Sequence, residues 1–247
     1  MWRASAPSAA RTWPWRGSRK DGKAVEARGT SGNQGERAPT LQPWVKYCSS
    51  CGGEVQAAVP EGDSQWRHVC NACGKIDYQN PKMVVGCIVE HQGRMLLCKR
   101  GIEPCKGKWT LPAGFMELGE SAVEGAKRET LEEVKANVDV HAPFAHFDIP
   151  RIGQAYILFR GSLASPYEYG IGAESLEAKL FHLDDIPYAE IAFSSITIAI
   201  QKYVEDREAG RYSVHHGIID KKPGSSPNDP SGYELRGYFA TPTVHTV

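Results

Sequence analysis

The sequence predicts an α/β fold, in which a mixed β-sheet is flanked by helices and follows a small cysteine-rich module. Three observations support this prediction. Runs of apolar, β-branched residues bounded by turn-forming residues are typical of strands, and they recur between residues 82 and 183. An amphipathic segment that opens with a helix-capping sequence follows the first of these runs. Two closely spaced cysteine pairs precede them all.

The amino-terminal segment does not show the pattern of a folded domain. Residues 1–20 contain five basic residues and no acidic residue, are rich in Ala and Ser, and lack a long apolar stretch. This composition is typical of an organelle transit peptide, and a disordered basic tail is the alternative. Residues 21–42 continue in Gly, Ser and charged residues, which indicates a linker. We therefore predict that folded structure begins near residue 43.

The two cysteine pairs have the spacing of a four-thiolate zinc ribbon, predicted over residues 43–79. The ligands would be Cys48, Cys51, Cys70 and Cys73. A glycine follows each pair and permits the positive φ that turns backbone amides toward the sulfurs. A redox pair or four free thiols are the alternatives. Because four thiolates close the coordination sphere, such a zinc ion is structural and not catalytic.

A β-hairpin is predicted at the start of the next segment. Lys82–His91 and Arg94–Arg100 are apolar runs, and Gln92-Gly93 between them is suited to a two-residue turn. Continuing this register places Cys87 opposite Cys98, where a reversible disulfide would regulate activity. The alternative is a pair of small buried side chains.

A helix is predicted to begin after Ser121, because Ser121 and Glu124 form an S-x-x-E capping box. Three carboxylates then share one helical face: Glu129, Glu132 and Glu133. Crowded carboxylates repel one another, and a hard cation such as Mg²⁺ or Mn²⁺ relieves that repulsion. The alternative is a solvated acidic face paired with neighbouring basic residues.

The later elements complete the predicted sheet and its helical layers. Further strands are expected at Val138–Ile149, Gln154–Leu163 and Ala178–Leu183. A second helix is expected over Ser195–Ala209, with an apolar stripe on one side. These elements assign residues 80–212 to one domain and leave residues 213–247 as a carboxy-terminal extension.

Overall charge excludes some classes of partner. The chain has 29 basic and 29 acidic residues, so no net field attracts nucleic acid or an anionic membrane. No apolar run approaches the roughly 20 residues needed to span a bilayer. We therefore expect a small-molecule ligand, with neither nucleic acid nor membrane as a partner.

The acidic helix resembles the Nudix box, G-x5-E-x7-R-E-U-x-E-E-x-G-U. Its fixed residues are matched by Gly114, Glu120, Arg128, Glu129, Glu132 and Glu133. The resemblance implies an α/β/α sandwich and a hydrolase that holds Mg²⁺ or Mn²⁺ against a substrate diphosphate. It implies that the three helical glutamates bind metal and that Gly114 lets the backbone approach it. Arg128 is similar to the arginine that orients the glutamates.

The resemblance also implies roles for residues near the box. Glu120 is similar to the glutamate that steadies its loop, and a further ligand or base from outside the box would be Glu174 or Glu177. Two positions depart from the pattern. Thr130 replaces an aliphatic residue, and Lys135 replaces the glycine that ends the helix in a left-handed conformation. Either Lys135 takes that conformation, or the helix continues toward Asn137.

Several further segments resemble a subgroup of plant chloroplastic Nudix hydrolases that carry a zinc ribbon. They include YQNPKMVVGCIVE, WTLPAGFMELGES and FDIPRIGQAYILF. This resemblance implies hydrolysis of FAD to FMN and AMP and of ADP-ribose to AMP and ribose 5-phosphate. It agrees with a plastid location, for which a mitochondrion is the alternative, and it leaves a homodimer open. Aromatic candidates for stacking on the substrate are Trp109, Phe115, Phe144 and Phe147.

Two other functions remain open. NADH pyrophosphatases also join a zinc ribbon to a Nudix box, but the SQPWPFPxS signature after their box has only AFSSI at 192–196 as a counterpart here. A Nudix nucleotide sensor would bind without hydrolysis, and the intact set of glutamates argues against it.

Overall fold

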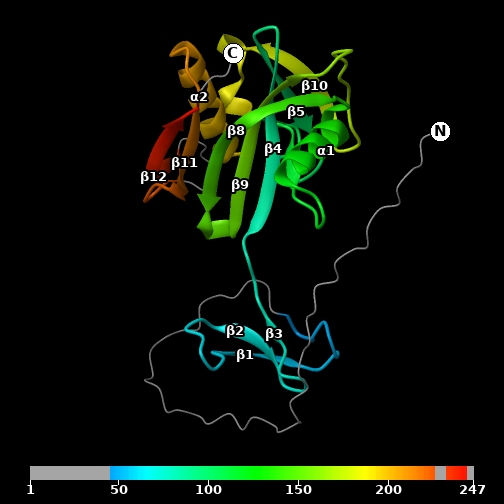
Figure 1. Ribbon diagram of the computed structural model, residues 1–247, viewed down its shortest axis with the longest axis vertical. Helices are drawn as coiled ribbons and strands as arrows, with labels where there is room; N and C mark the ends of the chain where they lie inside the picture. The colour runs from blue at the N-terminus through cyan, green and yellow to red at the C-terminus, as the bar shows by residue number, and fades with distance from the viewer. Residues whose placement is uncertain (1–44, 226–231, 244–247) are drawn as a thin grey trace, which may run out of the picture. The chain divides into compact units, whose positions relative to one another are not determined.

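A computed structural model of the chain describes residues 45–225 and 232–243 (Figure 1). It divides into two compact units, Met1–Asp77 and Tyr78–Val247. The predicted transit peptide and linker, residues 1–42, lie outside the described residues. No helix in the described ranges has the length and apolar character needed to cross a bilayer.

The first unit contains a small antiparallel sheet with the strand order β1-β2-β3. Its strands are β1 Val55–Ala58, β2 Arg67–Cys70 and β3 Ile76–Asp77. Only Cys48, His68 and Cys70 are buried among its described residues. The unit therefore has almost no apolar core of its own.

The second unit is built on a nine-stranded mixed sheet. Its main path runs β10-β5-β4-β9-β8-β11-β12, while β6 pairs with β5 and β7 pairs with β4. The pairs β4–β9 and β8–β11 are parallel, and the other pairs are antiparallel. The strands are β4 Lys82–His91, β5 Arg94–Arg100, β6 Trp109–Thr110, β7 Ala113–Phe115, β8 Val138–Ile149, β9 Gln154–Leu163, β10 Ser175–His182, β11 Ser213–Lys221 and β12 Tyr233–Pro242.

Four of the predicted strands have the predicted bounds, and the fifth, β10, begins three residues earlier than Ala178. The two-residue strand β6 and the three-residue strand β7 were not predicted. Segments this short cannot show the alternation of apolar and polar residues that indicates a strand. Residues 213–247, predicted as an extension, contribute β11 and β12 to the sheet.

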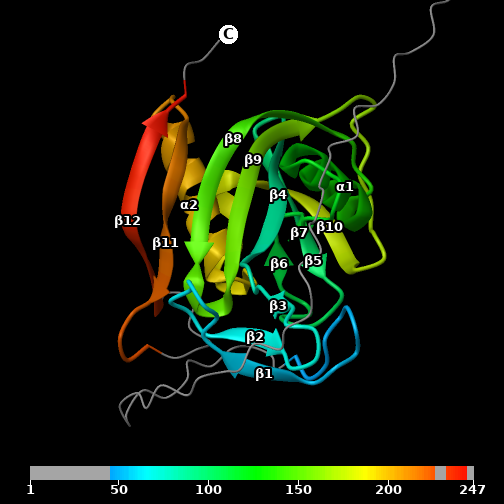
Figure 2. The same cartoon turned by 60° about the horizontal axis from the view of Figure 1, so that its bottom comes forward.

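Two helices cover opposite faces of this sheet. Along β9, Tyr156 and Leu158 belong to a core cluster that includes α2 (Ser194–Glu208), whereas Ile157 and Phe159 belong to a cluster that includes α1 (Ala122–Val134). Figure 2 shows α1 beside β4 and α2 beside β11. This arrangement confirms the predicted α/β/α sandwich, since alternate residues of a strand face opposite layers.

The predicted hairpin forms only near its turn. Gln92 and Gly93 have φ values of 50° and 78°, as a two-residue turn requires. The strands pair there at two positions, and then β7 pairs with β4 and β6 with β5. The prediction that Cys87 lies directly opposite Cys98 is therefore wrong, because the strands diverge before these residues. Both cysteines are buried free thiols.

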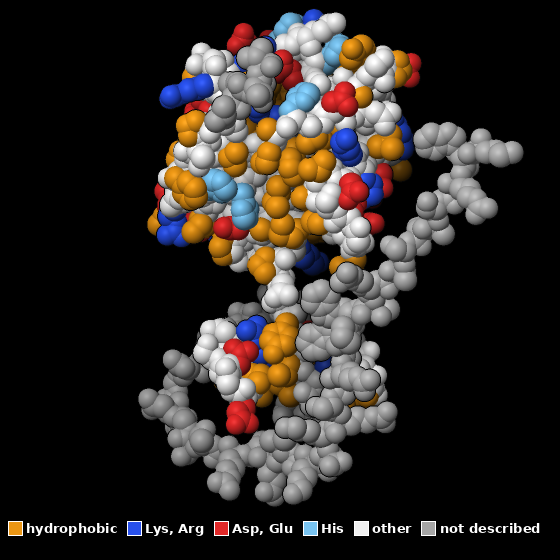
Figure 3. All heavy atoms as spheres, in the orientation of Figure 1, with side chains coloured by type: hydrophobic (Ala, Val, Ile, Leu, Met, Phe, Trp, Pro, Cys, Tyr) orange, Lys and Arg blue, Asp and Glu red, His pale blue; other side chains and the backbone are white. Residues whose placement is uncertain are grey.

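Part of the sheet surface stays open. Hydrophobic side chains gather over β8 and β9 on the face shown in Figure 3, and no helix lies in front of these strands in Figure 1.

The predicted homodimer stays a prediction, since the structure contains one chain.

Candidate active site

The helix α1 begins and ends as its local sequence directs. Ser121 Oγ accepts a hydrogen bond from the N–H of Glu124 at 3.3 Å, and Glu124 Oε2 accepts one from the N–H of Ser121 at 2.7 Å. This is the predicted capping box. At the other end, Lys135 has φ 53° and donates its N–H to the Leu131 carbonyl at 3.0 Å. Lys135 therefore takes the left-handed conformation, and the helix does not continue to Asn137.

Lys135→Gly is expected to raise the free energy of unfolding by about 0.5 kcal/mol. A left-handed conformation costs a non-glycine residue about 1 kcal/mol, and the greater entropy of glycine in the unfolded chain offsets part of this gain. Urea denaturation of the full chain measures the change. Lys127→Gly is the matched control, because Lys127 is exposed inside α1 and its replacement should cost about 1 kcal/mol. Equal losses in both variants would contradict this account.

Two of the three predicted metal-binding carboxylates of α1 contact the side chain of Arg128. Glu129 and Glu133 are buried, whereas the Glu132 side chain is 58% exposed. Arg128 Nη1 donates to Glu129 Oε1 at 2.8 Å and to Glu132 Oε2 at 3.0 Å. All three predicted metal ligands, Glu129, Glu132 and Glu133, line one cleft, although their carboxylate oxygens are not gathered at one point.

Arg128 also ties the helix to the loop before it. Its Nε and Nη2 donate to the two oxygens of Glu120 at 3.0 and 2.8 Å, and Nη2 donates to the Phe115 carbonyl at 3.0 Å. Glu120 accepts a further bond from the Glu117 N–H at 2.7 Å. These bonds lower the pKa of Glu120 to about 2. The pair therefore holds the loop against α1 with a charged, bidentate contact.

Negative charge at the site is only partly compensated. Burial raises the pKa of Glu133 to about 7; the Ala113 N–H at 3.1 Å opposes this shift, and repulsion by Glu129 adds to it. Burial also raises the pKa of Glu129, against the effect of Arg128 and with the repulsion of Glu132 and Glu174. A divalent cation bound among these oxygens would remove that repulsion, so the donor set fits Mg²⁺ or Mn²⁺.

Gly114 leaves room for the carboxylate of Glu129. A Cβ atom at Gly114 would lie 2.4 Å from the Glu129 carboxylate, so a larger residue would displace this carboxylate from its place in the cleft. The neighbouring Thr130 is fully buried, and its Oγ1 donates to the Ala126 carbonyl at 2.7 Å. The hydroxyl that replaces an aliphatic group is therefore satisfied inside the helix.

A distant loop caps the end of α1 and positions Glu174. Gly170 and Gly172 donate their N–H groups to the carbonyls of Val134 at 2.7 Å and Glu133 at 2.9 Å. A Cβ at Gly172 would lie 1.8 Å from the Glu132 carbonyl oxygen, so this approach needs glycine. The two glycines were missed by the sequence reasoning. Their only signal is their place in a glycine-rich stretch before β10.

The two candidate acids beyond the box have different positions. Glu174 lines the same cleft as Glu129, Glu132 and Glu133, whereas Glu177 lies 3.8 Å from Lys99 Nζ in an ion pair. Of the two, Glu174 is placed to act with the helical carboxylates.

The carboxylates line a cleft of about 780 Å³. Of the four aromatic candidates, only Phe115 lines it, and Trp109, Phe144 and Phe147 are buried in the core. The prediction that they stack on the substrate was therefore wrong for these three. The alternation of apolar and polar residues along a strand shows which side chains are buried, but not which of them line a cavity. The cleft is also lined by residues that the sequence did not predict: Arg100, Ile152, Gln154, Tyr156, Ala173 and Phe193.

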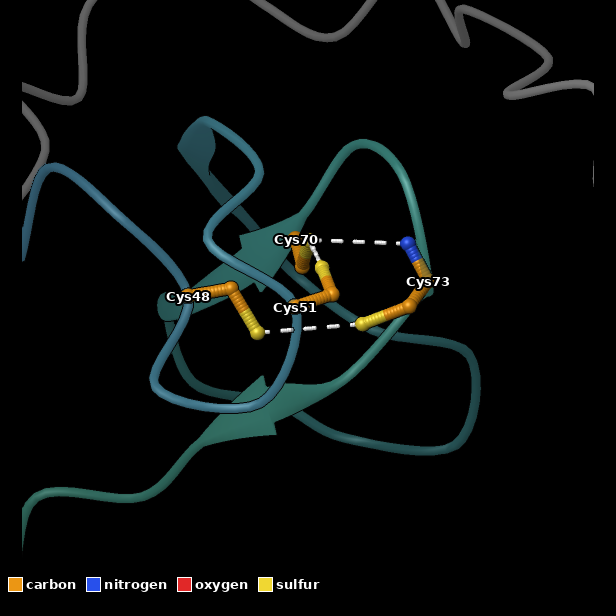
Figure 4. Close-up of side chains that lie close together, drawn as sticks. All are labelled: Cys48, Cys51, Cys70 and Cys73. Carbon is orange, nitrogen blue, oxygen red and sulfur yellow. Dashed lines mark hydrogen bonds between the residues drawn. The ribbon is translucent and has the colours of Figure 1, made fainter.

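The cysteines of the first unit form a separate centre (Figure 4). Cys48, Cys51 and Cys73 lie on loops and Cys70 ends strand β2. The four thiols point toward one another, with their sulfurs within 4.8 Å. The Cys48–Cys73 and Cys51–Cys70 sulfur separations are 3.7 and 3.5 Å, near the roughly 3.8 Å expected for tetrahedral Zn–S bonds of about 2.3 Å. Within the described ranges this is the one set of side chains whose ligand atoms are already gathered.

Backbone amides stabilise the thiolate forms in this centre. Cys48 Sγ accepts the N–H of Ser50 at 3.3 Å, and Cys51 Sγ accepts that of Gly53 at 3.4 Å. The N–H of Cys73 lies 3.5 Å from Cys70 Sγ and is the main cause that lowers the pKa of Cys70 to about 6. Gly52 and Gly74 have φ values of 72° and 71°, as predicted. The arrangement fits a structural zinc ion.

Comparison with known proteins agrees with both centres. The family described as Nudix N-terminal, a zinc ribbon, matches residues 46–79, and the NUDIX domain matches residues 80–198. A crystal structure of a NUDIX hydrolase from Nitrosomonas europaea is 49% identical, with a TM-score of 0.69. The match covers 72% of this chain and 100% of that one.

The chain belongs to the Nudix family.

Named relatives of this Nudix protein have more than one activity. The NAD-capped RNA hydrolase NudC of Stutzerimonas stutzeri (strain A1501) is 29% identical over 69% of this chain and 61% of its own length. The ADP-ribose pyrophosphatase of Methanocaldococcus jannaschii is 30% identical over 44% of this chain and 67% of its own. The chain thus spans about three fifths of the NudC relative. The comparisons do not show the specific plant subgroup.

Proposed function

We propose that this Nudix protein hydrolyses the diphosphate bond of nucleoside diphosphate derivatives, with FAD and ADP-ribose as substrates. The products would be FMN and AMP from FAD, and AMP and ribose 5-phosphate from ADP-ribose. The observation that carries the proposal is the group of four carboxylates on one cleft: Glu129, Glu132, Glu133 and Glu174.

The shape of the cleft supports a dinucleotide-like substrate. Its volume of about 780 Å³ lies within the range of small-molecule sites. Phe115, Tyr156 and Phe193 line it and offer aromatic surfaces for a nucleobase or an isoalloxazine ring. Arg100 lies 5.1 Å above the Phe193 ring and adds positive charge near the substrate phosphates.

Each polar residue of the cleft has its own role in the proposed reaction. The helical glutamates would hold Mg²⁺ or Mn²⁺, and such an ion would neutralise developing charge and lower the pKa of an attacking water. Arg128 fixes the directions of Glu129 and Glu132, and the Ala113 N–H fixes Glu133. Glu174 serves as a further ligand or as the base that takes a proton from water.

An NAD-linked substrate is the second candidate, because NudC relatives are named NAD-capped RNA hydrolases. Capped RNA would be a nucleic-acid partner, so the prediction that excludes nucleic acid stays untested. Against this candidate, residues 192–196 (AFSSI) lack the NADH pyrophosphatase signature where α2 begins.

A substrate panel tests the proposal. The full chain is assayed with FAD, ADP-ribose, NADH and a short NAD-capped RNA, in Mg²⁺ and in EDTA. Release of FMN and AMP that requires Mg²⁺ supports the proposal. Cleavage of NADH or capped RNA without FAD or ADP-ribose would transfer support to the second candidate. Binding without hydrolysis across the panel would indicate a nucleotide sensor.

We also propose a plastid location and a homodimer. Residues 1–42 fused to a fluorescent protein should direct it to plastids, and accumulation in mitochondria would favour the alternative. Light scattering during size-exclusion chromatography should give twice the mass of 27.2 kDa. A monomeric mass would contradict the dimer.

A further inference from the structure

A second cavity of about 680 Å³ adjoins the proposed catalytic cleft. The two share Ile152, Tyr156 and Phe193 as lining residues, so they meet at these three side chains. The far side of the second cavity is built by β11 and β12, which supply Ile219, Asp220, Lys221 and Tyr233. These strands lie beyond residue 198, where the match to the NUDIX domain ends.

Positive charge dominates this second cavity. Lys108, Arg151 and Lys221 line it, and none of the three takes part in an ion pair found within residues 45–225 and 232–243. The only acidic residue in the lining, Asp220, is paired with Arg236 and accepts the N–H of Lys221 at 2.8 Å. Its charge is therefore compensated from outside the cavity, and the three cations remain available to a ligand.

The position of the cations relative to the carboxylates indicates which part of a ligand they meet. The substrate diphosphate would lie at the glutamates, so the ribose next to it would reach the junction that Tyr156 and Phe193 line. A substituent on this ribose would then enter the second cavity. Three cations beyond it suit an additional phosphate on that ribose, because Lys and Arg bind phosphate through charge-assisted hydrogen bonds.

We propose that this second cavity binds a phosphate carried on the ribose of a nucleoside diphosphate substrate, an inference that rests on the proposed function. FAD and ADP-ribose lack this group, so the cavity extends the substrate class. The reaction is unchanged: the water oxygen bonds to one phosphorus, the bond from that phosphorus to the bridging oxygen breaks, and this oxygen leaves with the other phosphate. The ribose phosphate is retained in the product.

Matched substrate pairs isolate the contribution of the extra phosphate. Coenzyme A and dephospho-coenzyme A differ by a 3′-phosphate, and NADPH and NADH differ by a 2′-phosphate. For at least one pair, kcat/KM of the full chain should be about tenfold or more higher for the phosphorylated member, as expected for a charge-assisted contact. Equal values within both pairs would overturn the proposal.

Three variants connect that preference to the cavity. Arg151→Ala, Lys221→Ala and Lys108→Ala should each lower kcat/KM for the phosphorylated member about tenfold while leaving its partner within about twofold. Lys106→Ala is the matched control, because Lys106 is exposed in the same loop as Lys108 and lines neither cavity. A preference that survives all three substitutions would contradict the assignment.

Binding separates this proposal from the proposed hydrolysis. Calorimetry should show that adenosine 3′,5′-bisphosphate or 2′,5′-bisphosphate binds the full chain more tightly than AMP, and that Arg151→Ala removes the difference. If no substrate of the panel is cleaved but this preference holds, the hydrolysis fails and the phosphate site stands. An NAD-capped RNA with a 3′-linked chain identifies the source: a preference for it over free NADPH and coenzyme A indicates a phosphodiester.

Discussion

Glu133→Gln is expected to lower kcat for FAD or ADP-ribose about 10³-fold, because it removes a metal-binding charge while keeping the shape of the side chain. The amide oxygen can still accept the Ala113 N–H that Glu133 accepts at 3.1 Å. The loss should therefore come from chemistry and not from a displaced helix. Single-turnover and steady-state assays in Mg²⁺ measure it, with Glu205→Gln as the control. Glu205 is an exposed carboxylate of α2 remote from the cleft lining.

The same variant should be more stable than the wild type in EDTA at pH 8.5. The pKa of Glu133 is raised to about 7, mainly by burial. The folded state therefore binds a proton more tightly than the unfolded state, and the contribution of this group to stability falls as pH rises through 7. Neutral Gln avoids that loss. Because this loss accumulates from the ordinary pKa of 4.5 up to about 7, differential scanning calorimetry at pH 5.5 and 8.5 should show a larger gain at the higher pH. A lower melting temperature together with lower activity would mean that Glu133 is structural.

Removal of zinc is expected to unfold the first unit and leave the second folded. Within residues 45–77 only Cys48, His68 and Cys70 are buried, so no apolar core replaces the metal. Zinc binding in such modules provides about 10–16 kcal/mol of free energy, which becomes folding free energy. Cys70→Ser should therefore reduce bound zinc from one per chain to near zero. It should also abolish the hydrogen-exchange protection of β1 and β2.

The second unit should keep its protection and its hydrolysis, because every residue of the proposed catalytic cleft lies beyond residue 78. Cys105→Ser is the matched control, since Cys105 is a free thiol outside the cluster and should leave zinc at one per chain. Metal analysis and exchange mass spectrometry of the full chain provide the measurements. Retained protection of β2 in the zinc-free Cys70→Ser variant would refute a metal-dependent fold.

Local sequence determined much of this protein. The helix α1 starts at its capping box, and its three carboxylates share a face, because both features depend on residues within a few positions of each other. The four cysteines meet because short turns aim each pair at one point. The long strands β4, β5, β8 and β9 have their predicted bounds because each carries a sufficient run of β-forming residues.

Tertiary structure decided the features that depend on residues far apart in the chain. The hairpin turn alone would have placed Cys87 directly opposite Cys98. The strands β7 and β6 pair with β4 and β5 instead, so the two cysteines are not cross-strand partners. Glu174 reaches the cleft because Gly170 and Gly172 bond the end of α1, and nothing near Glu174 in sequence distinguishes it from Glu177. The cations of the second cavity come from three separate segments. Periodicity and spacing report local preferences, whereas a cavity is the space left where non-local segments pack, so only the packed chain determines its lining.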